Sequence, residues 1–414
     1  MTLVEYGAPI SIQLTEKEVE SLRLASSSWR KKLRLKYSPL SISGNGNNSY
    51  LVTARGVAGF ISVGDLHLEI IPKYIAESDS DSWKVSMWRF LSYGKGFNLF
   101  EHTRIGLSRQ DGIVDLLAEL FLSSVQGVNE IGYAISYKEV EVVGGNLVGY
   151  LNPERYDTFL PVTGELHLIT DELSNDNDIN QLLKWAGAQL EANVESNELR
   201  KRLMHWSEEL SHVSDVKPLR KVAAQRLNNY SHLKPAVEIS ELLLDDLTVN
   251  FSQDFANVPG FLWDSDALFE RAIFRLFKET LLSCGLRVVK QHLTLASGDN
   301  GQKLITIPDL LFKNSERIVF LGDAKYKNYK GRPSPEDFYQ IMAGAALVGL
   351  DCAALIYPAS GGELLIDEFT VASNQKPGRV YAVKIGINAF SSSSSLFSLK
   401  RELKHWIESI LSSS

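Results

Sequence analysis

The chain has few cysteines and lacks both a secretory signal and an unbroken apolar run of membrane length. Its two cysteines, Cys284 and Cys352, are too few for a disulfide framework in 414 residues. The N-terminus has no basic stretch followed by an apolar one, and Asp351 interrupts the longest nearly apolar stretch, residues 341–359. We therefore expect a cytoplasmic protein that does not enter a membrane.

A net positive charge is also absent. The formal net charge is −7 at pH 7, so the composition gives no global sign of a nucleic-acid-binding protein, and any basic surface must be local. Hydrophobic residues make up 44% of the chain and charged residues 22%, which is ordinary for a soluble globular protein. The length allows two or three domains, each with its own core.

Several motifs of common enzyme classes are missing as well. The chain has no G-x-x-x-x-G-K-[ST] segment, so we do not expect it to hydrolyse a nucleotide by itself. It has no Gly-x-Ser-x-Gly segment, which argues against a serine hydrolase of that type. Its eight histidines show no metal-ligand spacing, and Asp176 and Asp178 lack the glycine and glutamate of a calcium loop.

Strand patterns dominate the first part of the chain. Up to about residue 170, alternating or β-branched runs predict strands, with a helical segment around 113–125 between them. Residues 30–36, RKKLRLK, carry five basic residues in seven. They could contact DNA or a partner, but we prefer to interpret them as a strand with a solvated face.

The pattern changes twice before the C-terminal third. Residues 172–245 are helical in pattern, and residues 249–263 contain proline and glycine without a sustained period, which indicates a connector. We therefore expect an N-terminal β-rich module with helical segments over residues 1–245 and a second domain over residues 246–414.

Helices and strands alternate in the second domain. Asp264 or Ser265 caps an amphipathic helix over 264–285, and Ser334 caps another that has Pro335 at its first position. The other predicted elements are strands at LRVVKQHLTL, KLITIPDLLF, RIVFLGDAKY, CAALIYP and VYAVKIGI and a helix at LFSLKRELKHWIESIL. This order is typical of an α/β domain, so the whole chain is predicted to be an α/β and α+β multidomain protein.

Two aspartates occur inside these predicted strands, where apolar residues are expected. They are Asp309 and Asp323, and Lys325 follows two residues later on the face of Asp323. A lone buried carboxylate is costly, and Mg²⁺ prefers one or two carboxylates together with waters. We predict that both aspartates bind Mg²⁺ or Mn²⁺, that the backbone carbonyl of Ala324 adds a ligand, and that Lys325 orients or activates a water for phosphodiester hydrolysis.

Further polar residues extend this candidate site. Glu270 lies at the edge of the apolar stripe of its helix, from which its carboxylate could support the metal. Gln340 shares a helix face with small and apolar residues and should therefore have a polar partner. Lys327, Lys330 and Arg332 are candidates for phosphate contacts. The alternatives are a turn or capping role for Asp309 after Pro308, an exposed ion pair of Asp323 with Lys325, a solvated Glu270 and a solvated basic loop.

The candidate residues follow the order of a known pattern. They resemble the PD-(D/E)XK nuclease superfamily through Glu270, Pro308-Asp309, Asp323-Ala324-Lys325 and Gln340. More narrowly, the segments LFERAIFRLF, IPDLLF, GDAKYKNY and EDFYQIMAGA resemble the McrC family, the nuclease subunits of McrBC restriction systems. The strand that ends in Ile70-Ile71-Pro72-Lys73 agrees with this resemblance.

The resemblance implies a fold and a function. Residues 246–414 would form a restriction-endonuclease-like PD-(D/E)XK domain, and residues 1–245 would bind a partner. The protein would be a Mg²⁺-dependent DNA endonuclease subunit of a 5-methylcytosine restriction system, and it would stimulate a McrB-like AAA+ GTPase hexamer. Two alternatives are a non-catalytic adaptor that activates the AAA+ motor and a DNA nuclease that cuts without a motor.

Overall fold

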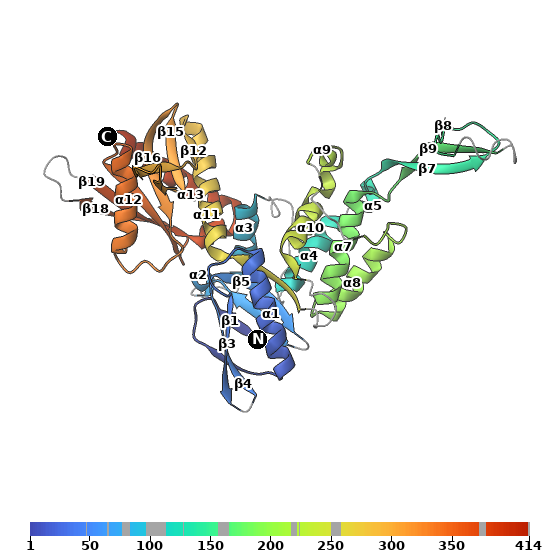
Figure 1. Ribbon diagram of the computed structural model, residues 1–414, viewed down its shortest axis with the longest axis horizontal. Coiled ribbons are helices and arrows are strands. Elements are labelled where there is room, and N and C mark those ends of the chain that lie inside the picture. The colour runs from blue at the N-terminus through green and yellow to red at the C-terminus, as the bar shows by residue number, and fades with distance from the viewer. Residues whose placement is uncertain are drawn as a thin grey trace. The chain divides into compact units, whose positions relative to one another are not determined.

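The computed structural model describes residues 1–46, 48–63, 66–76, 83–96, 113–126, 128–155, 165–216, 222, 224–249, 258–371 and 378–412. Contacts divide the chain into two compact units (Figure 1). Unit 1 contains Met1–His102 and Asp246–Ser414, and unit 2 contains Thr103–Asp245. None of the helices in the described residues combines the length and the apolar character that a membrane crossing requires.

Two sheets and a long helix form the N-terminal part of unit 1. A five-stranded sheet has the order β1-β6-β5-β11-β10, and a three-stranded sheet has the order β2-β4-β3. α1 (Glu16–Lys32) begins with a capping box between Thr15 and Glu18, and its Trp29 is fully buried in the core. The strands are β1 (Thr2–Val4), β2 (Ile10–Gln13), β3 (Leu40–Gly46), β4 (Ser49–Ala54), β5 (Val57–Val63), β6 (Leu66–Ile71), β10 (Leu247–Val249) and β11 (Val258–Asp264).

The observed division of the chain differs from the predicted domains, 1–245 and 246–414. A boundary does fall near residue 245, but residues 1–102 pack with residues 246–414 rather than with unit 2. The reason is a long-range strand pair, because β11 lies antiparallel to β5 with Gly260 opposite Ile61. Pairing between segments so far apart in sequence leaves no local pattern that would predict it.

Two sequence interpretations in this part of unit 1 are wrong. The predicted connector over 249–263 contains a strand from residue 258 onward, while residues 250–257 lie outside the described residues. Residues 30–36 are not a strand with a solvated face, since Arg30, Lys31 and Lys32 form the last turn of α1 and a turn follows. Basic side chains at that end interact favourably with the helix dipole, which explains the run physically.

Short helices connect the N-terminal sheets to the rest of unit 1. α2 (Lys73–Ala76) and α3 (Trp83–Lys95) follow β6, and α3 packs against α11 (Ser265–Leu281). A Cβ atom at Gly94 would lie 2.6 Å from Cδ1 of Leu268, so a glycine permits this close helix contact.

A six-stranded mixed sheet forms the C-terminal part of unit 1. Its order is β12-β15-β16-β17-β19-β18, with β16, β17 and β19 parallel to one another and the other strands antiparallel to their neighbours. The predicted strands at RIVFLGDAKY, CAALIYP and VYAVKIGI are confirmed, and β18 is an addition that the sequence pattern did not indicate. LRVVKQHLTL and KLITIPDLLF were each predicted as one strand but are each divided into two, and Asp309 lies in the break within the second. The strands are β12 (Arg287–Val289), β15 (Leu310–Asn314), β16 (Arg317–Ala324), β17 (Cys352–Ala359), β18 (Leu364–Val371) and β19 (Gly378–Gly386).

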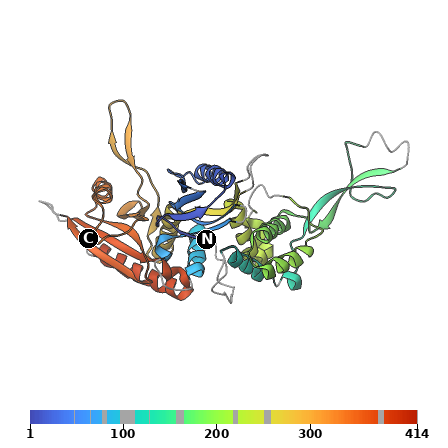
Figure 2. The same cartoon turned by 90° about the horizontal axis from the view of Figure 1, so that it is seen from below.

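Helices cover both faces of this sheet. Leu311 and Leu321 share one hydrophobic cluster with Ile341 of α12 (Pro335–Leu347). On the opposite face, the ring of Phe320 contacts Trp406 of α13 (Ser393–Ser412). The hairpin of β13 (Leu293–Ser297) and β14 (Lys303–Thr306) extends away from the sheet (Figure 2).

Unit 2 combines a helical body with an extended β-arm. The arm is a three-stranded sheet of order β7-β9-β8, which projects from the helices of the same unit (Figure 1). The mixed α/β, multidomain fold class is thereby confirmed. The elements of unit 2 are α4 (Ile113–Val125), α5 (Val128–Ile131), β7 (Ser136–Gly144), β8 (Tyr150–Leu151), β9 (Leu166–Ser174), α7 (Asp178–Asn193), α8 (Asn197–Glu208), α9 (Ala224–Leu227), η1 (Asn228–Leu233) and α10 (Lys234–Asp246).

Candidate active site

The antiparallel pair β15–β16 brings the two predicted aspartates together. Asp323 lies in β16 and is 5% exposed, and Asp309 lies one residue before β15. Because Leu310 is paired with Gly322, the next position of the same register places Asp309 beside Asp323. Two acidic side chains therefore share one end of this strand pair.

Asp309 lies in an environment that disfavours its negative charge. Its Oδ2 accepts the backbone N–H of Ala324 at 2.9 Å, and 17% of its side chain is exposed. Burial, together with the neighbouring carboxylates of Asp323 and Glu270, raises the pKa of Asp309 to about 9. Without a cation, the cluster would therefore hold a proton at neutral pH.

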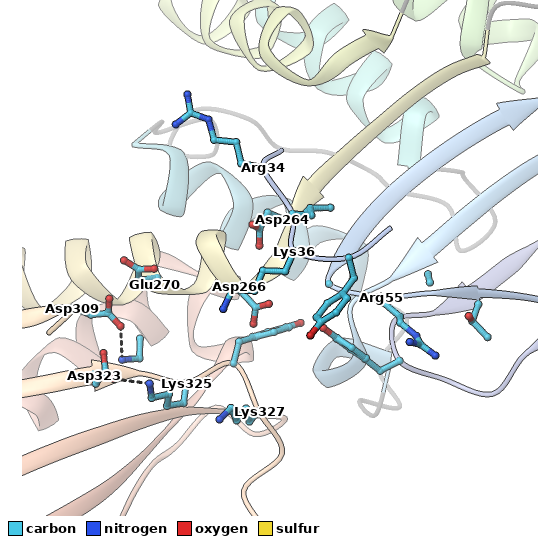
Figure 3. Close-up of a pocket in the computed structure, with 18 of the residues that line it drawn as sticks. Arg34, Lys36, Arg55, Asp264, Asp266, Glu270, Asp309, Asp323, Lys325 and Lys327 are labelled. Carbon is cyan, nitrogen blue, oxygen red and sulfur yellow. Dashed lines mark hydrogen bonds and ion pairs between the residues drawn. The ribbon is translucent and has the colours of Figure 1, made fainter. Parts of the chain in front are cut away.

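Lys325 is fixed in place by its backbone and by its ammonium group. The backbone N–H donates to the carbonyl of Ile356 at 2.7 Å, which continues the pairing of β16 with β17. The Nζ atom lies 2.6 Å from Oδ2 of Asp323 and donates to Oε1 of Gln340 at 3.1 Å (Figure 3). Gln340 is exposed on α12, and Lys325 is the polar partner that the sequence analysis required for it.

Glu270 reaches the same cluster from α11, whose N-terminus is capped by Asp264. Its carboxylate bonds to the ammonium of Lys290, and Nζ of Lys290 also lies 4.0 Å from Oδ1 of Asp309. Burial by itself would raise the pKa of Glu270, but the hydrogen bond from Lys290 and the interaction with Asp309 lower it. Lys290 thus places a positive charge between Glu270 and Asp309. The sequence analysis did not identify this residue.

The three basic residues predicted to contact phosphates have different surroundings. Nζ of Lys327 lies 2.8 Å and 3.0 Å from the two carboxylate oxygens of Asp337, so its charge is paired. Lys330 and Arg332 are exposed but are not among the residues that line the cleft of the acidic cluster. The structure therefore brings one of the three to the site, already bonded to a buried aspartate.

The acidic cluster lies at one end of a cleft of about 970 Å³ (Figure 3). Asp264 and Asp266 line its middle, and burial raises the pKa of each. Arg34, Lys36 and Arg55 from the N-terminal part of unit 1 also line the cleft, with Lys36 beside Asp266 and Arg55 on the side away from Asp309 (Figure 3). The sequence analysis did not place these three near the aspartates.

The donor set fits Mg²⁺ or Mn²⁺. The carboxylates of Asp309 and Asp323 and the carbonyl of Ala324 are hard oxygen donors, and Mg²⁺ usually binds one or two carboxylates with waters. The raised pKa of Asp309 indicates a negative charge that its present neighbours do not compensate. Within the described ranges, no three His, Cys, Asp or Glu side chains form a ready-made metal cage. Glu270 would have to leave Lys290 before it could act as a third ligand.

Comparison with known proteins identifies the family. The family model of the McrBC 5-methylcytosine restriction system component matches residues 52–358. The chain belongs to this family. The match spans β5, β6 and β11 of the N-terminal part of unit 1, all of unit 2 and the acidic cluster, and it confirms the resemblance inferred from the sequence. No curated protein matched the sequence of this McrBC component.

Solved structures agree on the fold of this McrBC component. A chain of the Thermococcus gammatolerans half-complex of McrB AAA+ hexamers with bound McrC is 19% identical, with a TM-score of 0.67 over 98% of this chain and 99% of that chain. A chain of the Thermococcus gammatolerans McrBC complex is 20% identical, with a TM-score of 0.50 over 68% of this chain and 88% of that chain. At these identities the likeness concerns the fold.

The sequence analysis of this McrBC component identified the residues of the acidic cluster, but it did not place Lys290 or the basic residues of the cleft beside them. Asp309, Asp323, Lys325, Glu270 and Gln340 converge within one cleft. A residue that the sequence analysis missed is Lys290, which directly follows β12 and bonds to Glu270. The basic run at 30–36 stood out in the sequence, but nothing there placed it beside the aspartates, because that position depends on the packing of β5 with β11.

Proposed function

We propose that this McrBC component is the Mg²⁺-dependent DNA endonuclease subunit of a modification-dependent restriction system. The single observation that carries the proposal is the geometry of Asp309, Asp323 and Lys325. Two carboxylates and an ammonium group lie together at the end of adjacent strands, inside a cleft that also carries positive charge. A phosphodiester hydrolase needs these groups: oxygen ligands for a cation and a donor beside them.

The arrangement supports assignment to the PD-(D/E)XK superfamily. The order of residues that the sequence analysis recognised becomes a spatial cluster, with Asp309 before β15, Asp323 and Lys325 at the end of β16 and Gln340 on α12. Glu270 from the helix at the start of the domain joins the same cluster. A mixed sheet with helices on both faces is the expected support for such a site.

Each residue has a distinct chemical task in this proposal. Asp309 and Asp323 would hold the cation, which when bound lowers the pKa of a water and neutralises charge on the reacting phosphate. Lys325 has three N–H donors, and Asp323 and Gln340 accept two of them. The third donor would serve a phosphate oxygen or the attacking water. Glu270 would orient water at the cluster from its position beside Asp309.

We further propose that the partner is a McrB-like AAA+ GTPase hexamer. The similar solved chains come from McrBC complexes, one of them described as McrB AAA+ hexamers with bound McrC. The present chain lacks a phosphate-binding P-loop motif, which fits a subunit that depends on another protein for nucleotide hydrolysis.

The β-arm of unit 2 is a suitable surface for this partner. Its side chains include large hydrophobic residues that are at least half exposed: Tyr137, Leu147, Val148, Tyr150 and Leu173. Clustered exposed apolar side chains mark interaction surfaces, whereas a hairpin that only faces solvent would carry mainly polar side chains. This supports the expectation that residues before 246 bind the partner.

Cleavage of methylated DNA by the chain and its partner, with GTP and Mg²⁺, tests the proposal. Asp323→Ala should abolish cleavage and leave stimulation of the partner's GTPase intact, because the substituted residue belongs to unit 1 and not to the arm. The matched control is Asp299→Ala, which removes an exposed aspartate outside the cleft. Cleavage by Asp323→Ala in Mg²⁺ would falsify the assignment.

Two other outcomes distinguish the alternatives. GTPase stimulation by the wild-type chain without cleavage in Mg²⁺ or Mn²⁺ would indicate a non-catalytic adaptor. Cleavage by the chain alone, at the rate seen with the partner, would indicate a nuclease that needs no motor.

A further inference from the structure

Three basic residues line the same cleft as the acidic cluster. Arg34 and Lys36 follow α1, Arg55 follows β4, and all three line the cleft with Asp309 and Asp323 (Figure 3). They belong to the N-terminal part of unit 1, which the sequence analysis assigned to partner binding. We call Arg34, Lys36 and Arg55 the basic rim.

The turn after α1 fixes the first two residues of the basic rim. Arg34 has a φ of 55°, a left-handed conformation that residues other than glycine rarely adopt. The backbone N–H of Leu35 donates to the carbonyl of Arg30 at 2.9 Å, and the guanidinium of Arg30 donates to the carbonyl of Lys36 at 3.2 Å. The backbone is therefore held in a shape that presents both side chains to the cleft.

The third residue is tied to the helix that carries Glu270. The backbone N–H of Arg55 donates to the carbonyl of Pro39 at 2.8 Å. The carbonyl of the next residue, Gly56, accepts the backbone N–H of Ser265 in the first turn of α11 at 3.2 Å. Arg55 thus has a defined position relative to the acidic cluster.

A second buried contact holds the two sides of the cleft together. The hydroxyl of Tyr326, next to Lys325, donates to Oε2 of Glu5 at 2.9 Å. The ammonium of Lys73 donates to the carbonyl of Tyr326 at 3.2 Å and lies over the rings of Tyr6, Tyr74 and Tyr326 at 4.6–4.8 Å. The basic rim and the loop of Lys325 therefore belong to one packed structure.

The charges of the basic rim differ from those of the other cleft lysines. Lys325 and Lys327 each form an ion pair with a buried aspartate. All three residues of the basic rim are exposed, and the ion pairs found among the described residues include none of them. Lys36 lies near Asp266 and lowers the pKa of that carboxyl against the effect of burial, but among the described residues it forms no ion pair with it. The charges of Arg34 and Arg55 remain available to a ligand.

DNA has the chemistry that fits both ends of the cleft. Each strand carries a phosphate about every 3.4 Å along the helix axis, so a phosphate at Asp309 and Asp323 must have neighbours elsewhere in the cleft. Arginine and lysine are the usual phosphate contacts. Tyr6 and Tyr37 also line the cleft and are 52% and 75% exposed, which suits contact with sugars or bases.

We propose that Arg34, Lys36 and Arg55 hold the DNA backbone while a phosphate of the same DNA lies at the acidic cluster. The inference rests on the proposed function for the identity of the nucleic acid. It assigns part of substrate binding to the N-terminal part of unit 1, whose five-stranded sheet contains β11. Substrate binding would then not depend on the six-stranded sheet of the C-terminal part alone.

Binding of the full-length chain to a fluorescein-labelled DNA duplex, followed by anisotropy in EDTA so that no cleavage occurs, tests this proposal. The variant R34A/K36A/R55A should bind at least about tenfold more weakly at 100 mM salt, and the slope of log K against log salt should fall by about 2.7, or 0.9 for each phosphate contact. The variant R34K/R55K keeps the charges and should keep most of the affinity.

The matched control removes the same number of charges elsewhere. Lys17, Lys278 and Arg317 are exposed and do not line the cleft, so K17A/K278A/R317A should keep the wild-type affinity and slope. Thermal unfolding of each variant checks that it is folded.

Five results would overturn the proposal. They are an unchanged slope for R34A/K36A/R55A, an equal loss in the control, loss of partner binding instead of DNA binding, absence of DNA binding by the wild-type chain even at low salt, and preference for an RNA duplex. A basic rim that binds DNA in a protein that never cleaves would leave this inference standing and remove the proposed function.

Discussion

Two aspartates of unit 1, the buried Asp337 and the half-buried Asp309, differ sharply in how their charge is compensated. Asp337, in the first turn of α12, is 4% exposed, and both of its carboxylate oxygens bond to Lys327. Burial by itself would raise the pKa of Asp337, but the hydrogen bonds from Lys327 and Ser334 outweigh it and lower the pKa. Asp309 instead has two acidic neighbours, and its pKa rises to about 9.

The difference shows why burial alone does not identify a functional acid. A buried carboxylate with a bonded lysine is a structural pair, whereas one that shares its site with other carboxylates calls for a cation. Lys325 lies near both aspartate environments, 2.6 Å from Asp323 and 3.8 Å from Asp337. The following experiments separate the two kinds of acid.

The largest expected effect is on cleavage. Lys325→Ala should lower the cleavage rate by about 10²–10⁴-fold, because it removes the donor beside the reacting phosphate. Lys327→Ala should retain most of the rate, because its partner is Asp337 and not the acidic cluster. Single-turnover cleavage in Mg²⁺ with the partner present measures both rates. Equal losses of rate in the two variants would show that Lys325 and Lys327 do not differ in their role.

The second effect is on stability. Asp337→Asn should lower the free energy of unfolding by about 2 kcal/mol, because it removes the carboxylate that satisfies Lys327. Asp309→Asn in metal-free buffer should not destabilise the protein, because it removes a repelled charge. Urea denaturation measures both, with Asp299→Asn as the exposed control. A larger decrease in the free energy of unfolding for Asp309→Asn than for Asp337→Asn would contradict this expectation.

The third effect is the pH dependence of metal-free stability. Asp309 holds a proton in the folded state up to about pH 9, but in the unfolded chain it loses the proton near pH 4. Its contribution to the free energy of unfolding should therefore fall as the pH rises from about 4 to about 9. Asp337 has a lowered pKa, so its contribution is present above about pH 4 and is lost as the pH falls through its folded-state value.

Denaturant titrations between about pH 5 and about pH 8 measure this slope. The wild-type chain should become less stable with rising pH over this range, and Asp309→Asn or saturating Mg²⁺ should flatten the decline. The same slope in Asp309→Asn would show that another group causes it.

The smallest expected effect concerns Lys290. Its ammonium bonds to Glu270 and lies near Asp309, so it competes with a bound cation. Since both side chains of the Glu270 pair are more than one third exposed, the pair contributes only about 0.2–1 kcal/mol. Lys290→Ala should therefore tighten Mg²⁺ binding up to about fivefold. Isothermal titration with Mg²⁺ measures it, and weaker binding would mean that Lys290 supports the cation site.

The residue order around the acidic cluster was predictable for a physical reason. A carboxylate in or directly before an apolar strand is costly wherever the strand lies, so Asp323 and Asp309 stand out without a structure. The helix that carries Glu270 was predicted from its apolar stripe and its Asp264 cap, which depend only on neighbouring residues. Local rules were sufficient for these elements.

The parts that were not predictable depend on long-range contacts. Residues 258–263 looked like a connector, and they became a strand because β5 supplies a partner edge. Asp337 follows the cap of α12 in the sequence, and only its packing shows that it is buried against Lys327. The basic run at 30–36 contains both the end of α1 and part of the basic rim, and its composition does not separate the two.

The sequence by itself determined the family, the two aspartates and the lysine two residues further on, because strand periodicity and the cost of a buried charge act locally. Only the tertiary structure decided that the chain divides after residue 102 and that Lys290 lies between two acids. It also decided that Arg34 and Arg55 share a cleft with Asp309. These features depend on contacts between segments far apart in the chain, and local sequence patterns do not indicate such contacts.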